Sequence, residues 1–405
     1  MRFSFKCKTC GKQSLFSMDA TLCSCGGSWF VEYDLEKVAH TFTKENLIDR
    51  PASMWRYFEL LPVENNANIV SLGEGWTPLI RLRKAESILP VRKLWVKREE
   101  QNPTGSFKAR GFSAALSIAN ENGISKVAVN SNGNAASALS AYAAHAGMEA
   151  YVFLPKDCPG LIAQECIGYG AYTYLVDGLI HDAGRIIKEG QEEQGWYNVG
   201  TLQEPGRVEG KKTMGLEVAE QLDWRFPDVI IYPTGGGSGV IGMWNAFKQL
   251  KALGFMQGEL PRMVSVQEMG CQPIVDAIMS HAKFKSQTEK VISAPTGMRV
   301  PNPPDGELIL SVLRESGGTA VAVSKDEIKQ AQQSLGKQGI SSSPEGAATW
   351  AGLMQLLDQG WIRPEEEVVL FNTSHAMKYL PWEHPHTTPV VKTYQEWVKC
   401  RNEFI

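Results

Sequence analysis

The sequence lacks several features, and each absence excludes a class of protein. No run of about 18 consecutive apolar residues occurs, as a membrane-spanning helix would need. The 41 Lys and Arg residues nearly balance the 44 Asp and Glu residues, for a net charge of -3, and there is no long basic run. The charge therefore favours neither nucleic acid nor a membrane surface as a partner. The start, MRFSFKCKTCGK, has no apolar signal core, so we expect a cytoplasmic protein.

Disulfide staples are not expected, because 405 residues leave room for two or three domains that bury their own cores. Four of the eight cysteines crowd the start as Cys7-x-x-Cys10-Gly and Cys23-x-Cys25-Gly-Gly. In a cytoplasmic chain this clustering favours metal over disulfides. The pattern resembles a zinc ribbon, in which four thiolates hold a structural zinc ion. The alternative is a reduced or vestigial knuckle without metal.

Short β-branched runs alternate with helical stretches from about Lys93 onward. The runs are continuously apolar, which favours parallel strands buried on both faces. Strands are expected at 93–97, 126–131, 149–155, 171–176, 228–234, 262–267, 319–323 and 367–374. Helical spacing covers 112–123, 134–147, 182–195, 213–223, 240–254 and 347–360, and several of these end at a glycine suited to a C-cap. The alternation predicts an α/β fold with doubly wound sheets.

Lys108 lies in the segment NPTGSFKARG, after a Gly-Ser turn and before an alanine-rich helical stretch. At a helix start, the dipole and partial burial both disfavour the charged ammonium, which makes such a lysine a good imine former. On spacing alone, a solvated loop lysine is an equal alternative.

This segment, together with EGWTPL at 74–79, resembles the threonine synthase family of pyridoxal-phosphate (PLP) enzymes, which has the tryptophan synthase β-like fold, fold type II. The resemblance runs from about Ile69 to Tyr379. It implies two doubly wound three-layer domains after a zinc-ribbon-like segment at 1–40. The large PLP-binding domain would cover 41–115 and 205–405, and the small substrate-gating domain 116–204. It also implies that Lys108 holds PLP covalently and later moves the substrate protons. We expect a homodimer.

A glycine loop follows the strand expected at 228–234, and it consists of Gly235, Gly236, Gly237, Ser238 and Gly239. Glycines let the backbone approach an anion, and the following helix start offers free N–H groups, so phosphate is the expected ligand. A dinucleotide loop of an oxidoreductase and tight packing without a ligand are alternatives, although the spacing is not Gly-x-Gly-x-x-Gly. In the resembled family this loop holds the PLP phosphate.

Two further polar turns end expected strands. Ser131, Asn132, Gly133 and Asn134 open a helix, which suits a carboxylate, or they form an ordinary N-cap cluster. The resemblance implies that this loop binds the substrate carboxylate and that Asn134 lies beside the cofactor ring oxygen. It also implies that Thr373 hydrogen-bonds the ring nitrogen. A neutral hydroxyl does not keep that nitrogen protonated, which favours elimination and replacement over transamination.

Arg207 opens the charged block RVEGKKT, which by itself is a solvated turn before a helix. In the resembled family an arginine here binds the leaving phosphate, and its planar fork suits that task. Thr201 is a second candidate for the same role. His375, near Thr373, is expected to be structural, and Glu345 in the turn SSSPEGAA has no assigned role.

Besides Ala109, which stands where many members have Asp, four positions depart from the usual family pattern, namely Asn132, Ala135, Ser374 and Ala376. They leave the cofactor assignment intact and bear on the substrate. The sequence predicts a PLP-dependent lyase that acts on a small amino acid, converting O-phospho-L-homoserine and water to L-threonine and phosphate. Alternatives are a PLP-dependent serine or threonine dehydratase, a β-replacement enzyme, and a non-catalytic PLP-binding or zinc-binding interaction protein.

Overall fold

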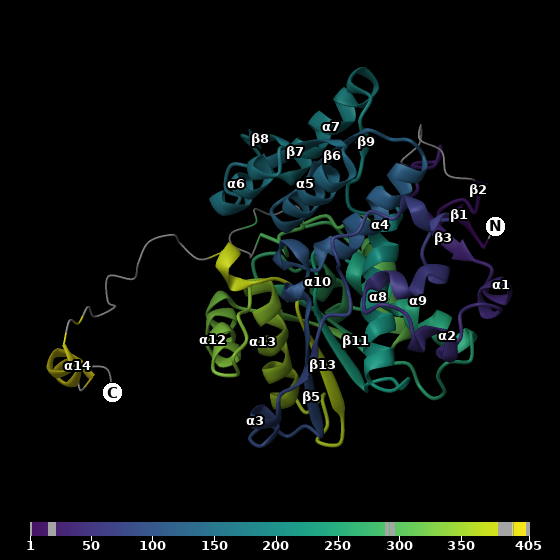
Figure 1. The fold of residues 1–405 in the computed structure, drawn as a ribbon. Coiled ribbons are helices and arrows are strands. Elements are labelled where there is room, and N and C mark those ends of the chain that lie inside the picture. The colour runs from purple at the N-terminus through teal and green to yellow at the C-terminus, as the bar shows by residue number, and fades with distance from the viewer. Residues whose placement is uncertain are drawn as a thin grey trace.

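Three β-sheets organise the chain in the computed structural model, which describes residues 2–14, 22–287, 291, 296–379, 391 and 393–401 (Figure 1). Their strand orders are β12-β11-β10-β13-β5-β4, β8-β7-β6-β9 and β2-β1-β3. The strands are β1 (Phe3–Cys7), β2 (Gln13–Ser14), β3 (Trp29–Tyr33), β4 (Leu79–Arg81), β5 (Lys93–Arg98), β6 (Lys126–Asn130), β7 (Glu149–Pro155), β8 (Tyr172–Val176), β9 (Tyr197–Asn198), β10 (Val229–Pro233), β11 (Arg262–Glu268), β12 (Thr319–Val323) and β13 (Glu367–Asn372).

Helices cover the sheets and connect their strands (Figure 1). They are α1 (Leu35–Ala39), α2 (Lys44–Ile48), α3 (Arg83–Glu86), α4 (Lys108–Glu121), α5 (Asn134–Ala146), α6 (Gly160–Gly168), α7 (Ile180–Gln194), α8 (Gly206–Gln221), α9 (Ser238–Ala252), α10 (Pro273–Met279), α11 (Gly306–Glu315), α12 (Lys325–Gly336), α13 (Pro344–Asp358) and α14 (Tyr394–Arg401). None of the helices in the described ranges is long and apolar enough to cross a membrane.

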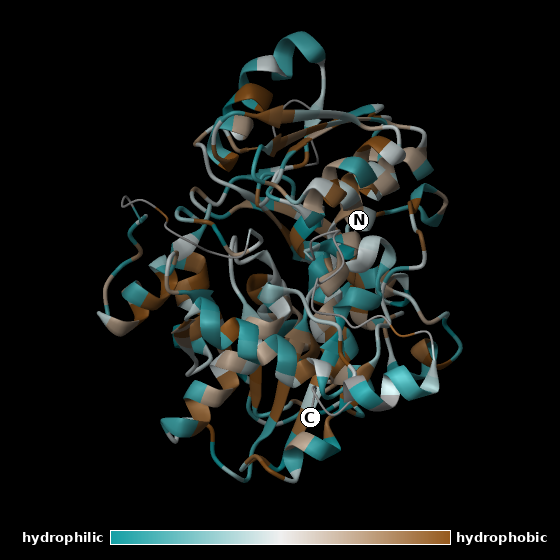
Figure 2. Cartoon of the chain, turned by 90° about the vertical axis from the view of Figure 1, so that its left-hand side faces the viewer, coloured by the Kyte–Doolittle hydropathy of each residue, from teal (hydrophilic) through white to brown (hydrophobic). Residues whose placement is uncertain are grey.

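The six-stranded sheet is parallel except for β4, which pairs antiparallel with β5 at one edge. Alternate residues of its strands enter different cores. Val229 and Ile231 pack with α12 and α13, whereas Ile230 and Tyr232 pack with α8, α9 and α11. Figure 2 shows hydrophobic strands beneath helices whose outer surfaces are hydrophilic. The sheet is therefore the middle of three layers, as the continuous apolar runs predicted.

The four-stranded sheet is parallel throughout and is also covered on both faces. Val127 and Val129 pack with α4, α5 and α6, whereas Ala128 packs with α7. The carboxyl ends of its strands and of the larger sheet both lead into the loops that carry the expected site residues. The predicted fold class is confirmed, with two doubly wound α/β units following a small N-terminal segment.

All eight expected strands form, and the glycines at 123, 147, 195, 254 and 360 have the positive φ of helix C-caps. One expectation was wrong. Strand β8 is an edge strand whose Tyr172, Tyr174 and Leu175 are exposed, so it is not buried on both faces. The helices that were not expected are α1, α2, α3, α6, α10, α11, α12 and α14. The helix expected at 213–223 begins seven residues earlier, at Gly206.

Helix α8 lies between α4 and α9 at very short range. A Cβ atom on Gly210 would collide with the carbonyl oxygen of Arg110 in α4, and one on Gly242 of α9 would lie 2.9 Å from the carbonyl oxygen of Val208. Only glycine permits this approach of backbones. The N-terminal sheet β2-β1-β3 contacts the same helix, where the Tyr33 hydroxyl donates to Glu209 at 2.8 Å.

Candidate active site

The site is a cavity of about 280 Å³ at the carboxyl ends of β6, β10 and β13, where doubly wound sheets bind their ligands. Most of the residues expected to bind cofactor or substrate line it, namely Lys108, Ser131, Asn132, Gly133, Asn134, Thr201, Gly235, Gly236, Gly237, Ser238, Gly239 and Thr373. The departures Ala135 and Ser374 also line it. Arg207 and Ala376 are not among the lining residues.

Lys108 is the first residue of α4, and the turn before it is tied to the end of β13. The backbone N–H of Phe107 donates to the carbonyl of Thr373 at 3.0 Å, and Ser106 bridges to Ser374. Burial and the nearby Arg207 guanidinium lower the pKa of Lys108 to about 7, against the weaker opposing charge of Glu345. A large share of this amine is therefore unprotonated near neutral pH, which is the form that attacks an aldehyde.

The glycine loop joins β10 to α9 and leaves little room for a side chain at its glycines. Gly237 has a φ of +77°, and a Cβ on Gly235 would lie 2.6 Å from the carbonyl oxygen of Gly297. Ser238 begins α9, so the first free N–H groups of a 15-residue helix meet the cavity here. This geometry suits a phosphate.

The loop 131–134 is held by its own first residue. Ser131 Oγ accepts from the N–H groups of Gly133 at 3.0 Å and Ala136 at 3.2 Å, and it donates to the carbonyl of Gly133. The Ser131 hydroxyl thus shapes the loop. The N–H group of Gly133 is used in this way and that of Ser131 donates to the carbonyl of Phe153, which leaves the N–H group of Asn132 and the start of α5 for a ligand. Asn132 donates to the carbonyl of Thr296 at 3.3 Å. The N-cap interpretation and the ligand interpretation of this turn are both compatible with that geometry.

Asn134 faces the cavity with one amide atom in use. Its Nδ2 donates to the Tyr379 hydroxyl at 2.8 Å, and its Oδ1 is buried without a partner among the described residues. Since the two amide atoms can exchange places, either a donor or an acceptor is open. An orphaned buried polar atom is costly unless a ligand satisfies it.

Thr373 and His375 follow the end of β13, and only Thr373 faces the cavity. The Thr373 side chain is buried and lines the cavity. His375 is not a lining residue, and its Nδ1 accepts from the backbone N–H of Met377 at 3.1 Å. The structural role expected for His375 fits this local cap.

Arg207 lies behind the cavity wall. Because α8 starts at Gly206, Arg207 is in its first turn and fully buried, and the solvated-turn alternative for this block is wrong. Its Nη1 donates to the carbonyl of Val199 at 2.5 Å, and its guanidinium carbon lies 4.1 Å from the centre of the Phe112 ring. Nε and Nη2 have no partner among the described residues. Burial lowers the pKa of Arg207 to about 10, although Glu204 opposes this.

Three residues near the cavity had no role assigned from the sequence. Glu345, at the start of α13, lines the cavity and accepts from the N–H of Gly297 at 2.8 Å, and burial raises the pKa of its carboxyl. Tyr379 lines the cavity beside Asn134. Lys211 lies just behind the glycine loop and donates to Ser238 Oγ at 2.8 Å. The charged block RVEGKKT offered a signal for Lys211, whereas Tyr379 offered none.

The cavity fits PLP, which has an aldehyde, a ring oxygen, a ring nitrogen and a phosphate. It offers one amine whose pKa is about 7, an amide with an open atom, a hydroxyl at a strand end and a glycine loop at a helix start. Each of these donors matches one functional group of PLP.

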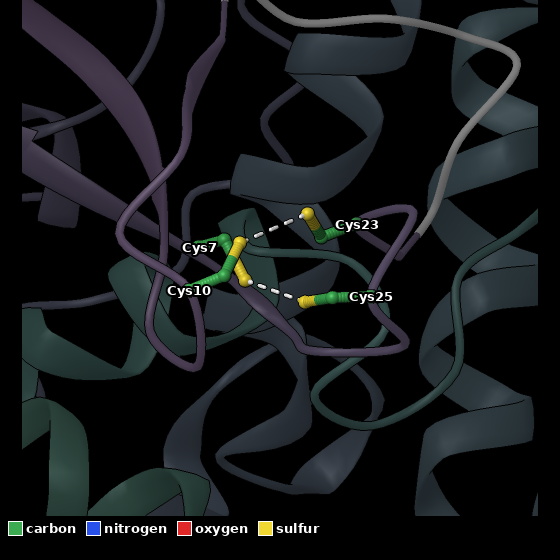
Figure 3. Close-up of side chains that lie close together, drawn as sticks. All are labelled: Cys7, Cys10, Cys23 and Cys25. Carbon is green, nitrogen blue, oxygen red and sulfur yellow. Dashed lines mark hydrogen bonds between the residues drawn. The ribbon is translucent and has the colours of Figure 1, made fainter.

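The four N-terminal cysteines lie together at the end of the ribbon (Figure 3). Their sulfur atoms all lie within 4.8 Å of one another, with 3.5 Å between Cys7 and Cys25 and 3.6 Å between Cys10 and Cys23. Four sulfurs at the usual zinc–sulfur bond length would be separated by about 3.8 Å. The short Cys-x-Cys spacing therefore still permits a tetrahedral site for a metal ion.

Comparison with known proteins agrees with this geometry. Residues 70–374 match the family model described as pyridoxal-phosphate dependent enzyme. Threonine synthase from Methanocaldococcus jannaschii is 37% identical over 378 residues, covering 92% of each chain. That from Methanosarcina acetivorans is 37% identical over 382 residues, covering 93% of this chain and 92% of the relative.

Solved structures share the fold at lower identity. Maize serine racemase has a TM-score of 0.62 and 20% identity, covering 81% of this chain and 92% of that one. Escherichia coli diaminopropionate ammonia lyase has a TM-score of 0.64 and 16% identity, covering 78% and 92%. The chain belongs to the threonine synthase family of pyridoxal-phosphate dependent enzymes.

Proposed function

We propose that this protein is a threonine synthase that converts O-phospho-L-homoserine and water to L-threonine and phosphate. The observation that carries the proposal is Lys108, whose pKa is about 7, in one cavity with a glycine loop and Thr373. The 37% identity to curated threonine synthases over more than nine-tenths of the chain supports the substrate.

The residues that would hold PLP follow from the fit of the cavity. Lys108 would hold the aldehyde carbon, the loop 235–239 the phosphate, Asn134 the ring oxygen and Thr373 the ring nitrogen. When bound, PLP supplies an electron sink for negative charge that develops on the substrate carbons. The neutral Thr373 hydroxyl leaves the ring nitrogen unprotonated, which favours elimination and replacement over transamination.

Lys108 would move the protons of the reaction. A large share of its Nζ is unprotonated near neutral pH, so it can take a proton from the substrate Cα and return a proton later at another carbon. A base whose pKa is close to the working pH serves in both directions.

The substrate would be held by its two anionic groups. The loop of Ser131, Asn132 and Gly133 precedes helix α5 and would receive the carboxylate, with the N–H group of Asn132 and those of the first turn of α5 as donors. Thr201, on the cavity wall, and the two unpartnered nitrogens of Arg207, Nε and Nη2, would favour the substrate phosphate. Because Arg207 lies behind the wall, we expect the neighbouring segment 200–205 to adjust when substrate binds.

The competing function is a PLP-dependent dehydratase or β-replacement enzyme. It is favoured by Ala135 and Ser374, which line the cavity and replace a hydroxyl and a glycine of the usual pattern. The products distinguish the two functions. Phosphate and L-threonine should form from O-phospho-L-homoserine, whereas a dehydratase would release ammonia and a 2-oxo acid from serine or threonine. Ammonia without phosphate across a substrate panel would refute our proposal.

The whole protein has further expected properties. We infer a cytoplasmic homodimer, a structural zinc ion on Cys7, Cys10, Cys23 and Cys25, and a small domain at 116–204 inserted between 41–115 and 205–405. Light scattering on the purified chain tests the dimer.

A further inference from the structure

Lys211 differs from the other fully buried lysines. Three lysine side chains in the described residues have no exposed surface, namely Lys97, Lys211 and Lys212. Lys97 pairs with Glu217 at 2.7 Å and Lys212 pairs with Glu209. Lys211 makes no ion pair with any described residue, and its one hydrogen bond goes to Ser238 Oγ.

The charges around Lys211 do not balance within the protein. Burial, Arg207 and Lys108 all lower the pKa of Lys211, and only Glu204 opposes them. The two carboxylate oxygens of Glu204 already accept from the N–H groups of Gly206 and Arg207, at 2.9 and 2.8 Å. Arg207, Lys108 and Lys211 therefore lie close together in a buried region, where Glu204 is the carboxylate that acts on Lys211 and Glu345 acts on Lys108. A buried cation without a counter-ion is strongly unfavourable, so the region is suited to an anion from outside.

The fold makes room for Lys211 specifically. A Cβ on Gly111 of α4 would lie 3.2 Å from Lys211 Cε and 3.0 Å from the carbonyl oxygen of Arg207. The last glycine of NPTGSFKARG thus admits the lysine stem between α4 and α8. This stem leads toward the glycine loop, where the ammonium meets Ser238.

The hydrogen bond to Lys211 sets the direction of the Ser238 hydroxyl. Lys211 Nζ donates to Ser238 Oγ, and in its charged form, which a neighbouring anion favours, the lysine can only donate. The O–H of Ser238 has no acceptor among the described residues, and Ser238 lines the cavity. That O–H is then free to donate to an anion seated on the loop.

We propose that Lys211 is a positioning residue of the phosphate site, which directs the Ser238 hydroxyl toward the cofactor phosphate and supplies positive charge beneath the glycine loop. The inference rests on the proposed PLP site, and it does not depend on which amino acid the enzyme converts.

The test compares PLP with pyridoxal, which lacks the phosphate. Full-length protein is dialysed free of cofactor, and each compound is titrated back while absorbance and tryptophan fluorescence are followed. In Lys211→Met the dissociation constant of PLP should rise by about 10- to 100-fold, as expected for loss of a charge-assisted hydrogen bond. The dissociation constant of pyridoxal should change by less than about threefold, because pyridoxal has no phosphate and so cannot lose the contact that the substitution removes.

Lys212→Met is the matched control, because it removes the adjacent buried lysine, which has its own carboxylate. It should lower the melting temperature and leave the ratio of the two dissociation constants as in the wild type. Lys211→Gln keeps a donor to Ser238 without the charge, so its ratio of dissociation constants should lie between those of the wild type and Lys211→Met. This variant replaces Lys211→Met in the test if the methionine variant does not fold. An unchanged ratio in the Lys211 variants would overturn this inference. Failure of the wild type to bind PLP would instead refute the proposed function.

Discussion

The lowered pKa of Lys108 predicts an unusually reactive amine in the cofactor-free protein. At pH 7.5 a lysine whose pKa is about 7 is about three-quarters unprotonated, whereas an ordinary lysine is unprotonated in about one molecule in a thousand. The rate of nucleophilic attack is proportional to the unprotonated fraction. At pH 7.5, Lys108 should therefore react several hundred-fold faster than the same amine would with an ordinary lysine pKa.

Trace acetylation of the cofactor-free protein measures this directly. The protein is labelled with acetic anhydride between pH 5 and pH 11, and the Lys108 peptide is quantified by mass spectrometry against peptides that carry exposed lysines. Labelling of Lys108 should be half-maximal near pH 7. A midpoint near pH 10, as for the exposed reference lysines, would refute the argument that burial and Arg207 set this pKa.

The cause of the shift can be tested separately. In Arg207→Met the positive charge near Lys108 is gone and burial remains, so the midpoint should move upward but stay below that of exposed lysines. Stability gives a second measure. Below pH 7 Lys108 is charged in both the folded and unfolded states, so the folded protein bears the full penalty of burying it. Between pH 7 and about pH 10.4 the folded state binds fewer protons, and stability rises with pH. Lys108→Met should therefore gain stability over the wild type at low pH, and the gain should shrink across this range.

Three further predictions concern the metal and the cavity. The purified protein should contain about one zinc ion per chain, and Cys10→Ser or a strong chelator should lower the melting temperature; a metal-free protein with unchanged melting would contradict the site. Gly235→Ala should weaken PLP binding more than tenfold, because its Cβ would lie 2.6 Å from the carbonyl oxygen of Gly297, and equal affinity in a titration would refute the close approach. Tyr379→Phe removes the acceptor for Asn134, so PLP affinity should fall about three- to tenfold, and wild-type affinity would show that Asn134 needs no such anchor.

Strands and loops with local signals could be predicted from the sequence. A run such as DVIIYPT is too apolar to lie anywhere except inside a sheet, and consecutive glycines between a strand and a helix have few uses other than close approach. The order of these segments then brought Lys108, Asn134, Ser238 and Thr373 to one cavity.

Burial of charge could not be predicted in the same way. The block RVEGKKT has the composition of a solvated turn, yet it forms the first part of α8 because glycines at 111, 210 and 242 let neighbouring helices cover it. Those partners are distant in sequence, so no local pattern reveals them. The same reason explains β8, whose apolar residues matched a central strand although the strand lies at an edge, which only the strand order decides.

The glycine contacts of α8 also fix a length. The two ends of the expected cofactor would be held at the first residues of α4 and α9, Lys108 and Ser238, and α8 separates these helices. Gly210 and Gly242 allow no closer approach of the helices on either side of α8. The thickness of α8 therefore sets the distance between the Lys108 amine and the glycine loop at 235–239. A larger residue at either glycine would stretch that span. The packing of α8 therefore bears on the expected cofactor site from positions that do not line the cavity.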